Sequence, residues 1–217
     1  MFPDLMFPED SRQHYTEISM NRRDLLAFAP ALLLPGCSSA PQPKPEPKPA
    51  EPVTGLHALY QMYQYSRTWA QDLTIVRCSS IGITQVKAQR GKAAAWQALF
   101  ASPLLARQRA YTFSVYDASV SLRQGIFADA TETLAGDSRP FPLAAARTDS
   151  DQAWDTALTH AADYAAKNPD MPISYTLDLG RTINDPVWRV IWGESASSSV
   201  FSVLVDASTG LYVETLH

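Results

Sequence analysis

The side chains best suited to chemistry in this chain of 217 residues are its two cysteines, Cys37 and Cys78. Cys78 lies in VRCSSIGI, a run rich in strand-forming residues, where an unpaired cysteine most simply serves as a small buried hydrophobe. A nucleophilic cysteine needs a histidine beside it, and neither His57 nor His160 has a local sequence signature that places it there. We therefore expect Cys78 to be structural.

The other polar motifs do not assemble an enzyme site. The segment GESAS, from Gly193 to Ser197, approaches a nucleophile elbow but lacks its second glycine. Asp178, Asp185 and Glu194 could form a carboxylate site, although turn and rim positions of a solvated sheet are the simpler interpretation. The sequence has no paired-histidine metal motif, no CxxC motif and no glycine-rich phosphate loop. We expect no catalytic residue, no metal, no cofactor and no enzymatic activity.

Cys37 has a different setting, because an apolar run precedes it. The run LLAFAPALLL (Leu25 to Leu34) follows MNRRD (Met20 to Asp24), which supplies positive charge. A membrane-spanning helix needs about 20 apolar residues, whereas the core of a signal peptide needs about 7 to 15. The sequence Leu34-Pro35-Gly36-Cys37 resembles the lipobox of bacterial lipoproteins, in which cleavage before the cysteine leaves its thiol to carry diacylglycerol.

This resemblance implies a membrane anchor through lipid on Cys37. It also implies a place in the cell envelope, at the outer membrane or periplasmic face of a Gram-negative organism. Arg22 and Arg23 resemble a twin-arginine export signal, so the general secretion route and folded export both stay open.

The segments around the signal have distinct compositions. With Met20 as the start, residues 1–19 are a mis-called N-terminal extension and residues 20–36 are the lipoprotein signal peptide; the alternative is a short cytoplasmic tail on an uncleaved anchor. Residues 37–54 alternate proline with polar residues, which predicts an extended polyproline II stalk. From Cys37 onward the chain carries 15 Lys and Arg against 17 Asp and Glu, so we expect no nucleic-acid partner.

Beyond the stalk, helical and strand patterns occur in the same order twice. Helical spacing of apolar residues predicts a helix in LHALYQMYQYSRTWAQD with Thr54 as a possible N-cap, and a second helix in TDSDQAWDTALTHAADYAAKNP with its own caps. The segments TIVRCSSIGITQV, AAAWQALF and RAYTFSVYDASVSLRQGIF predict strands after the first helix. The segments ISYTLDL, PVWRVIWG and VFSVLVDASTGLYVETL predict strands after the second. We expect two units, residues 55–136 and 137–217.

Three tryptophans on the predicted strands are candidate partner-binding residues: Trp96, Trp188 and Trp192. Because side chains alternate along a strand, Trp188 and Trp192 share one face, and Trp96 and Phe100 share the corresponding face in the first half. Two interpretations follow. The rings form a core under the helices, or they form an exposed aromatic platform that grips a partner.

The string Asp206-Ala207-Ser208-Thr209-Gly210 predicts a tight hairpin, because aspartate can accept from backbone amides and glycine can take a positive φ. Together with Trp188 and the preceding helix, this string resembles the end of a PepSY domain. The resemblance implies an α+β fold of two PepSY-like units, each a helix plus antiparallel strands, in one or two small sheets each covered by a helix. The architecture of the β-lactamase inhibitor protein is similar.

The PepSY resemblance also implies a non-catalytic module with a role in restraining peptidases. We therefore expect a membrane-anchored lipoprotein whose domain binds a protein of the envelope, as an inhibitor or regulator of a peptidase or another envelope enzyme. The alternative is an envelope module that binds a small or polymeric ligand, such as a cell-wall fragment. That alternative requires a concave pocket with convergent polar groups.

Overall fold

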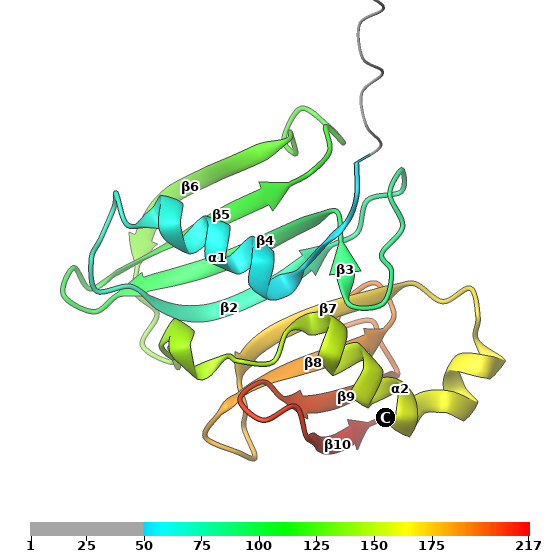
Figure 1. Ribbon diagram of the computed structural model, residues 1–217. Helices are drawn as coiled ribbons and strands as arrows, with labels where there is room; N and C mark the ends of the chain where they lie inside the picture. Colours follow the sequence, from blue (N-terminus) through cyan, green and yellow to red (C-terminus); the bar gives the residue numbers. More distant parts are fainter. Residues whose placement is uncertain (1–49) are drawn as a thin grey trace, which may run out of the picture. The chain divides into compact units, whose positions relative to one another are not determined.

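The computed structural model describes residues 50–217, which belong to one compact unit (Figure 1). The predicted N-terminal extension, the signal peptide, Cys37 and most of the stalk lie outside the described residues. The first half of the described chain contains β1 (Val53–Thr54), α1 (Gly55–Ser66), β2 (Thr74–Ile81), β3 (Lys92–Ala93), β4 (Ala95–Ser102), β5 (Arg107–Ser114) and β6 (Gly125–Thr133). The second half contains the 3-10 turn η1 (Leu143–Ala145), α2 (Ser150–Lys167), β7 (Ile173–Leu179), β8 (Pro186–Trp192), β9 (Phe201–Asp206) and β10 (Tyr212–Leu216).

Eight of these strands form one antiparallel sheet in the order β10-β9-β8-β7-β2-β4-β5-β6. Each half contributes four neighbouring strands, and the two sets meet where β2 pairs with β7, with Cys78 opposite Leu177 and Ser79 opposite Thr176. The short strands β1 and β3 pair separately as a two-stranded sheet.

The predicted fold class, an α+β fold of two PepSY-like units, is wrong. Residues 50–217 are mainly β, with 39% strand against 20% helix, and eight of the strands form one large sheet. The physical reason is the pairing of β2 with β7. If the two halves formed separate four-stranded sheets, β2 and β7 would each be an edge strand with unpaired backbone groups. Pairing β2 with β7 satisfies these groups and joins the halves into one sheet.

Both helices cover the same face of the sheet (Figure 1). The main apolar core lies beneath them, and a smaller cluster forms around Ile83, Ala94 and Ala95. The helices contribute the small or flexible buried residues of this core: Ala58, Leu59 and Met62 from α1, and Ala153, Ala157 and Ala161 from α2. The strands contribute large aromatic rings from the same face. Three alanines along α2 leave room for these rings, because a methyl group lets the helix backbone approach the sheet closely.

The second helix begins as its sequence predicts. Asp149 is its N-cap, and Asp149 and Gln152 form a capping box in which each side chain accepts from the backbone of the other residue. Asp151 lies in the first turn and Lys167 in the last, as favoured by the helix dipole. The predicted caps of this helix are confirmed.

The first helix begins differently from the prediction. Thr54 occupies the N-cap position, but its side chain makes no capping hydrogen bond. Instead, the Gly55 amide donates to Ser150 Oγ at 2.7 Å, and the Leu56 amide donates to Asp149 Oδ1 at 2.8 Å. The start of α2 therefore caps α1, and the Asp149 carboxylate lies where the positive ends of both helix dipoles meet.

The loop before β3 is bound to the same joint. Ser150 Oγ donates to the Gly91 carbonyl at 2.5 Å, and the Gly91 amide donates to the Tyr175 hydroxyl at 2.8 Å. Gly91 has φ +80°, and a Cβ there would overlap the backbone of Asp151. Only glycine fits this position, so the loop, both helices and β7 are fixed to one another.

Candidate functional site

The three predicted partner-binding tryptophans lie in the core. Trp96 and Trp188 are 0% exposed and Trp192 is 2% exposed. The rings of Trp96 and Trp188 meet edge to face with centroids 6.1 Å apart, so they pack the two halves together. Buried rings offer no surface to a partner. The observed geometry corresponds to the aromatic core, and the exposed platform interpretation is wrong for these residues.

The indole N–H groups of two of these tryptophans are also satisfied inside the protein. Trp96 Nε1 donates to the Val53 carbonyl at 3.1 Å, and Trp188 Nε1 donates to the Thr148 carbonyl at 2.8 Å. These bonds tie the strands to the segments that lead into α1 and α2.

The cysteine and serine motifs considered for catalysis are not brought together with a histidine in residues 50–217. Cys78 is fully buried, and burial together with the nearby Asp149 carboxylate raises the pKa of its thiol. Ser195 Oγ bonds to the hydroxyl groups of Ser197 and Ser198 in a loop, with no histidine recorded beside it. Within residues 50–217, no three His, Cys, Asp or Glu side chains are grouped closely enough to hold a metal ion.

The predicted turn at Asp206 and Gly210 is confirmed and is structural. The Asp206 carboxylate accepts from the Ser208 amide and from the Thr209 hydroxyl, each at 2.7 Å, and Gly210 has φ +77°. Burial alone would raise the pKa of Asp206, but the bonds from Thr209 and Ser208 lower it below its usual value. The Ala207 carbonyl then accepts from the two residues that precede the α2 cap, so the turn holds the start of that helix.

The second face of the sheet has neither of the described helices packed on it, and we call it the open face. One row of side chains crosses it with one residue from each strand. In sheet order the row is Glu214, Leu204, Arg189, Thr176, Ser79, Gln97, Thr112 and Phe127. All eight are partly or fully exposed, whereas their chain neighbours on the helix side form the core.

Charge gathers at the centre of the open face. Arg77 on β2 lies opposite Asp178 on β7, with Nε 3.6 Å from Oδ2. Burial raises the pKa of Asp178, against the influence of Arg77, Arg189 and Arg181. Arg189 donates from Nε to Ser202 Oγ at 2.9 Å. Three guanidinium groups therefore act on the Asp178 carboxylate, two from strands and Arg181 from the segment after β7, and Glu214 on β10 is a second carboxylate in the row.

The predicted partner-binding tryptophans lie on the helix side of these strands and not on the open face. The alternation that puts Trp96 and Trp188 in the core puts Gln97 and Arg189 on the open face. The polar residues that alternate with the aromatic ones along each strand are the sequence signal that predicts the open face.

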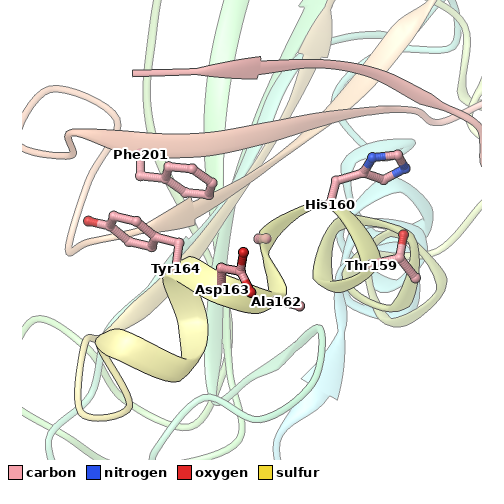
Figure 2. A pocket seen from close by; sticks show the side chains of 7 residues that line it. Thr159, His160, Ala162, Asp163, Tyr164 and Phe201 are labelled. Carbon is pink, nitrogen blue, oxygen red and sulfur yellow. The ribbon is translucent and has the colours of Figure 1, made fainter.

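A depression of about 330 Å³ lies on the helix side, beside α2. Its lining consists of Thr159, His160, Ala161, Ala162, Asp163, Tyr164 and Phe201. In Figure 2, Tyr164 and Phe201 lie on one side of the space and His160 and Thr159 on the other, with Asp163 and Ala162 between them.

Between residues 50 and 217, neither helix is long and apolar enough to cross a membrane.

Comparison with known proteins gives no relative from which a role could be transferred. The chain matches no protein-family model, no curated protein and no solved structure.

Proposed function

We propose that this protein is an exported lipoprotein, anchored in the envelope through lipid on Cys37, whose folded domain binds a protein partner across the open face. The observation that carries the proposal is the row of partly or fully exposed side chains from all eight strands, with no described helix over it. A continuous face of this width suits a protein surface better than a small molecule, since protein interfaces are broad and nearly flat.

The chemistry of the open face favours a partner with acidic groups. Arg77, Arg181 and Arg189 outnumber the carboxylates of Asp178 and Glu214, and charge complementarity would align acidic side chains of the partner with these arginines. Neutral hydrogen-bonding groups of Ser79, Gln97, Thr112 and Thr176 lie along the row toward β5.

The role we assign to this binding is regulation or inhibition of a peptidase or another envelope enzyme. A non-catalytic role agrees with the geometry of the polar motifs. The Cys78 thiol is enclosed, and the Ser195 hydroxyl bonds only to neighbouring serines. Inhibition would come from covering the partner's active cleft, with no covalent step.

Site-directed photo-crosslinking in the native envelope tests the proposal. A photoreactive amino acid would replace Gln97, which is exposed on the open face, and in a matched protein it would replace Gln61, which is exposed on α1. We expect a crosslinked protein of one discrete mass from position 97 and not from position 61. Arg189→Glu should weaken that crosslink, because it reverses the central charge.

Equal products from both positions, or none from position 97, would count against the open face. The purified partner would then be assayed with and without the protein, and loss of partner activity is the expected result. The anchor has a separate test. Cys37→Ser should remove the lipid mass and release the protein from the membrane fraction.

One observation favours the alternative function, binding of a small or polymeric ligand such as a cell-wall fragment. The depression beside α2 combines aromatic and polar lining residues, which is the composition expected of a ligand pocket.

A further inference from the structure

The turn between β4 and β5 exposes two leucines at its tip. The two strands end with Ser102 opposite Arg107, and residues 103–106 close the turn between them. Leu104 is 86% exposed and Leu105 is 51% exposed. The central positions of a turn usually hold glycine, proline, asparagine, aspartate or serine, so two leucines there call for another reason. We call residues 103–106 the leucine tip.

The leucine tip is held in one conformation by the protein behind it. The Asp72 carboxylate accepts from the Ser102 hydroxyl at 2.6 Å and from the Leu104 amide at 2.8 Å. The Ser102 hydroxyl oxygen accepts in turn from the Leu105 amide at 3.2 Å. Ala106 has φ +50°, in the left-handed region that disfavours alanine. Glycine at this position and polar residues before it would close the hairpin with less strain, so closure alone does not explain the leucines.

Each backbone N–H of the leucine tip is already bonded inside the protein. Pro103 has no N–H, and the Ala106 amide donates to the Pro103 carbonyl at 3.1 Å. The Leu104 and Leu105 amides donate to the Asp72 carboxylate and the Ser102 hydroxyl. The Ala106 carbonyl also accepts, from the Leu134 amide at 3.1 Å. An apolar segment can exchange water for lipid only when its backbone donors have partners, because hydrocarbon offers none.

From the exposed leucines and the satisfied amides we propose that the leucine tip contacts the surface of a lipid bilayer, with Leu104 and Leu105 inserted among the lipids. A protein that grips a loop commonly bonds to its backbone, and the amides of this tip are already used. A bilayer needs only apolar side chains. Arg107 is exposed beside the tip and favours anionic lipids. The Asp72 carboxylate opposes that charge, so we expect the apolar contact to dominate.

A fluorescent probe at the tip tests this contact. The full chain would carry Cys37→Ser together with Leu105→Cys, and an environment-sensitive nitrobenzoxadiazole fluorophore would be attached to the new cysteine. Cys78 is 0% exposed, so it does not compete for the label. The control is Val120→Cys in the same background, since Val120 is also an exposed apolar residue but lies in the loop after the other end of β5.

The probes would be compared on vesicles made of equal parts of phosphatidylcholine and phosphatidylglycerol. We expect the emission of the probe at position 105 to rise severalfold and to be quenched by spin-labelled lipid, and the emission at position 120 to stay unchanged. Binding of the whole chain to vesicles is not the readout, because the apolar run from Leu25 to Leu34 can also bind lipid. The difference between the two positions is what reports on the tip.

Matched variants at Leu104 measure the apolar contribution. Leu104→Ser, read with the probe at position 105, should shift the equilibrium between inserted and free tip about tenfold toward the free tip. Leu104→Ile keeps the apolar area and should leave that equilibrium unchanged. Because Leu104 is 86% exposed, both variants should keep the fold, and thermal unfolding would be measured to confirm it.

Three results would overturn the proposal. The first is an equal response of the probes at positions 105 and 120, which would mean that another segment brings the chain to lipid. The second is no response at position 105, which is also the result expected if the tip binds a protein instead. The third is equal insertion of the tip in Leu104→Ser and Leu104→Ile. The test needs neither the protein partner of the open face nor lipid on Cys37, so it can fail while the proposed function holds.

Discussion

The Ser150 hydroxyl is the most consequential single group at the joint of the two helices, and we predict that Ser150→Ala strongly destabilises the fold. Ser150 is 0% exposed, and its Oγ accepts from the Gly55 amide and donates to the Gly91 carbonyl. Alanine fits the same space but removes both bonds. A buried N–H and a buried carbonyl would then have lost their partner.

The magnitude follows from these two groups. An unsatisfied buried polar group costs about 1 to 3 kcal/mol, and partial relaxation of the loop at Gly91 brings the expected total to about 2 to 4 kcal/mol. Domains of this size unfold with a free energy of about 5 to 15 kcal/mol, so this single atom would account for a large share of the stability.

Urea unfolding followed by tryptophan fluorescence measures this loss, because Trp96 and Trp188 meet beside the joint. Ser197→Ala is the matched control, since Ser197 is exposed and its Oγ contacts only the hydroxyl of Ser195. The control should change the free energy of unfolding by less than about 0.5 kcal/mol. If Ser150→Ala unfolded at the same urea concentration as the control, the hydroxyl would not hold the joint and the reasoning would be refuted.

Three further predictions concern other positions. Gly91→Ala should lower the free energy of unfolding by about 2 to 4 kcal/mol, because of its positive φ and the overlap with the backbone of Asp151, whereas Gly82→Ala, with open space around it, should change it little in the same urea assay. Burial raises the pKa of the Cys78 thiol, so above about pH 8.5 the thiol loses its proton in the unfolded state but keeps it in the folded state. The free energy of unfolding should therefore fall above that pH by about 1.4 kcal/mol per pH unit. Cys78→Ala should remove this slope between about pH 8.5 and 10, and an unchanged slope would contradict the assignment. The lowered pKa of Asp206 acts in the opposite direction, so the stabilisation by its carboxylate is present above about pH 4 and is lost as pH falls further. Asp206→Ala should lower the free energy of unfolding by about 1 to 3 kcal/mol at pH 7 and by less at pH 3. Thermal unfolding at both pH values measures the difference.

The features that the sequence predicted correctly are those whose chemistry lies within a few residues. The N-cap of α2 at Asp149 and the first-turn acid Asp151 lie two residues apart, and the hairpin from Asp206 to Gly210 closes through bonds among its own residues. The shared face of Trp188 and Trp192 follows from strand alternation alone.

The features that the sequence did not predict depend on groups far apart in the chain. The cap of α1 comes from Asp149 and Ser150, which lie 93 and 95 residues beyond the amides that they accept from. The register of β2 against β7 is also long-range, and no local pattern encodes which two strand edges will meet. Alternation shows that two faces exist but not which one the helices cover, so the open face and the depression both required the structure.

The pairing of β2 with β7 has a consequence for how the chain is made. Strand β2 ends at Ile81 and β7 begins at Ile173, so at a synthesis rate of about 5 to 20 residues per second the central strand waits roughly 5 to 20 seconds for its second neighbour. Throughout that delay, β2 is a terminal strand rich in isoleucine and valine whose backbone can pair with another nascent chain. Chains interrupted between the two strands would keep this exposure permanently. We expect such fragments to aggregate through β2, a strand that has a neighbour on both sides in the finished molecule.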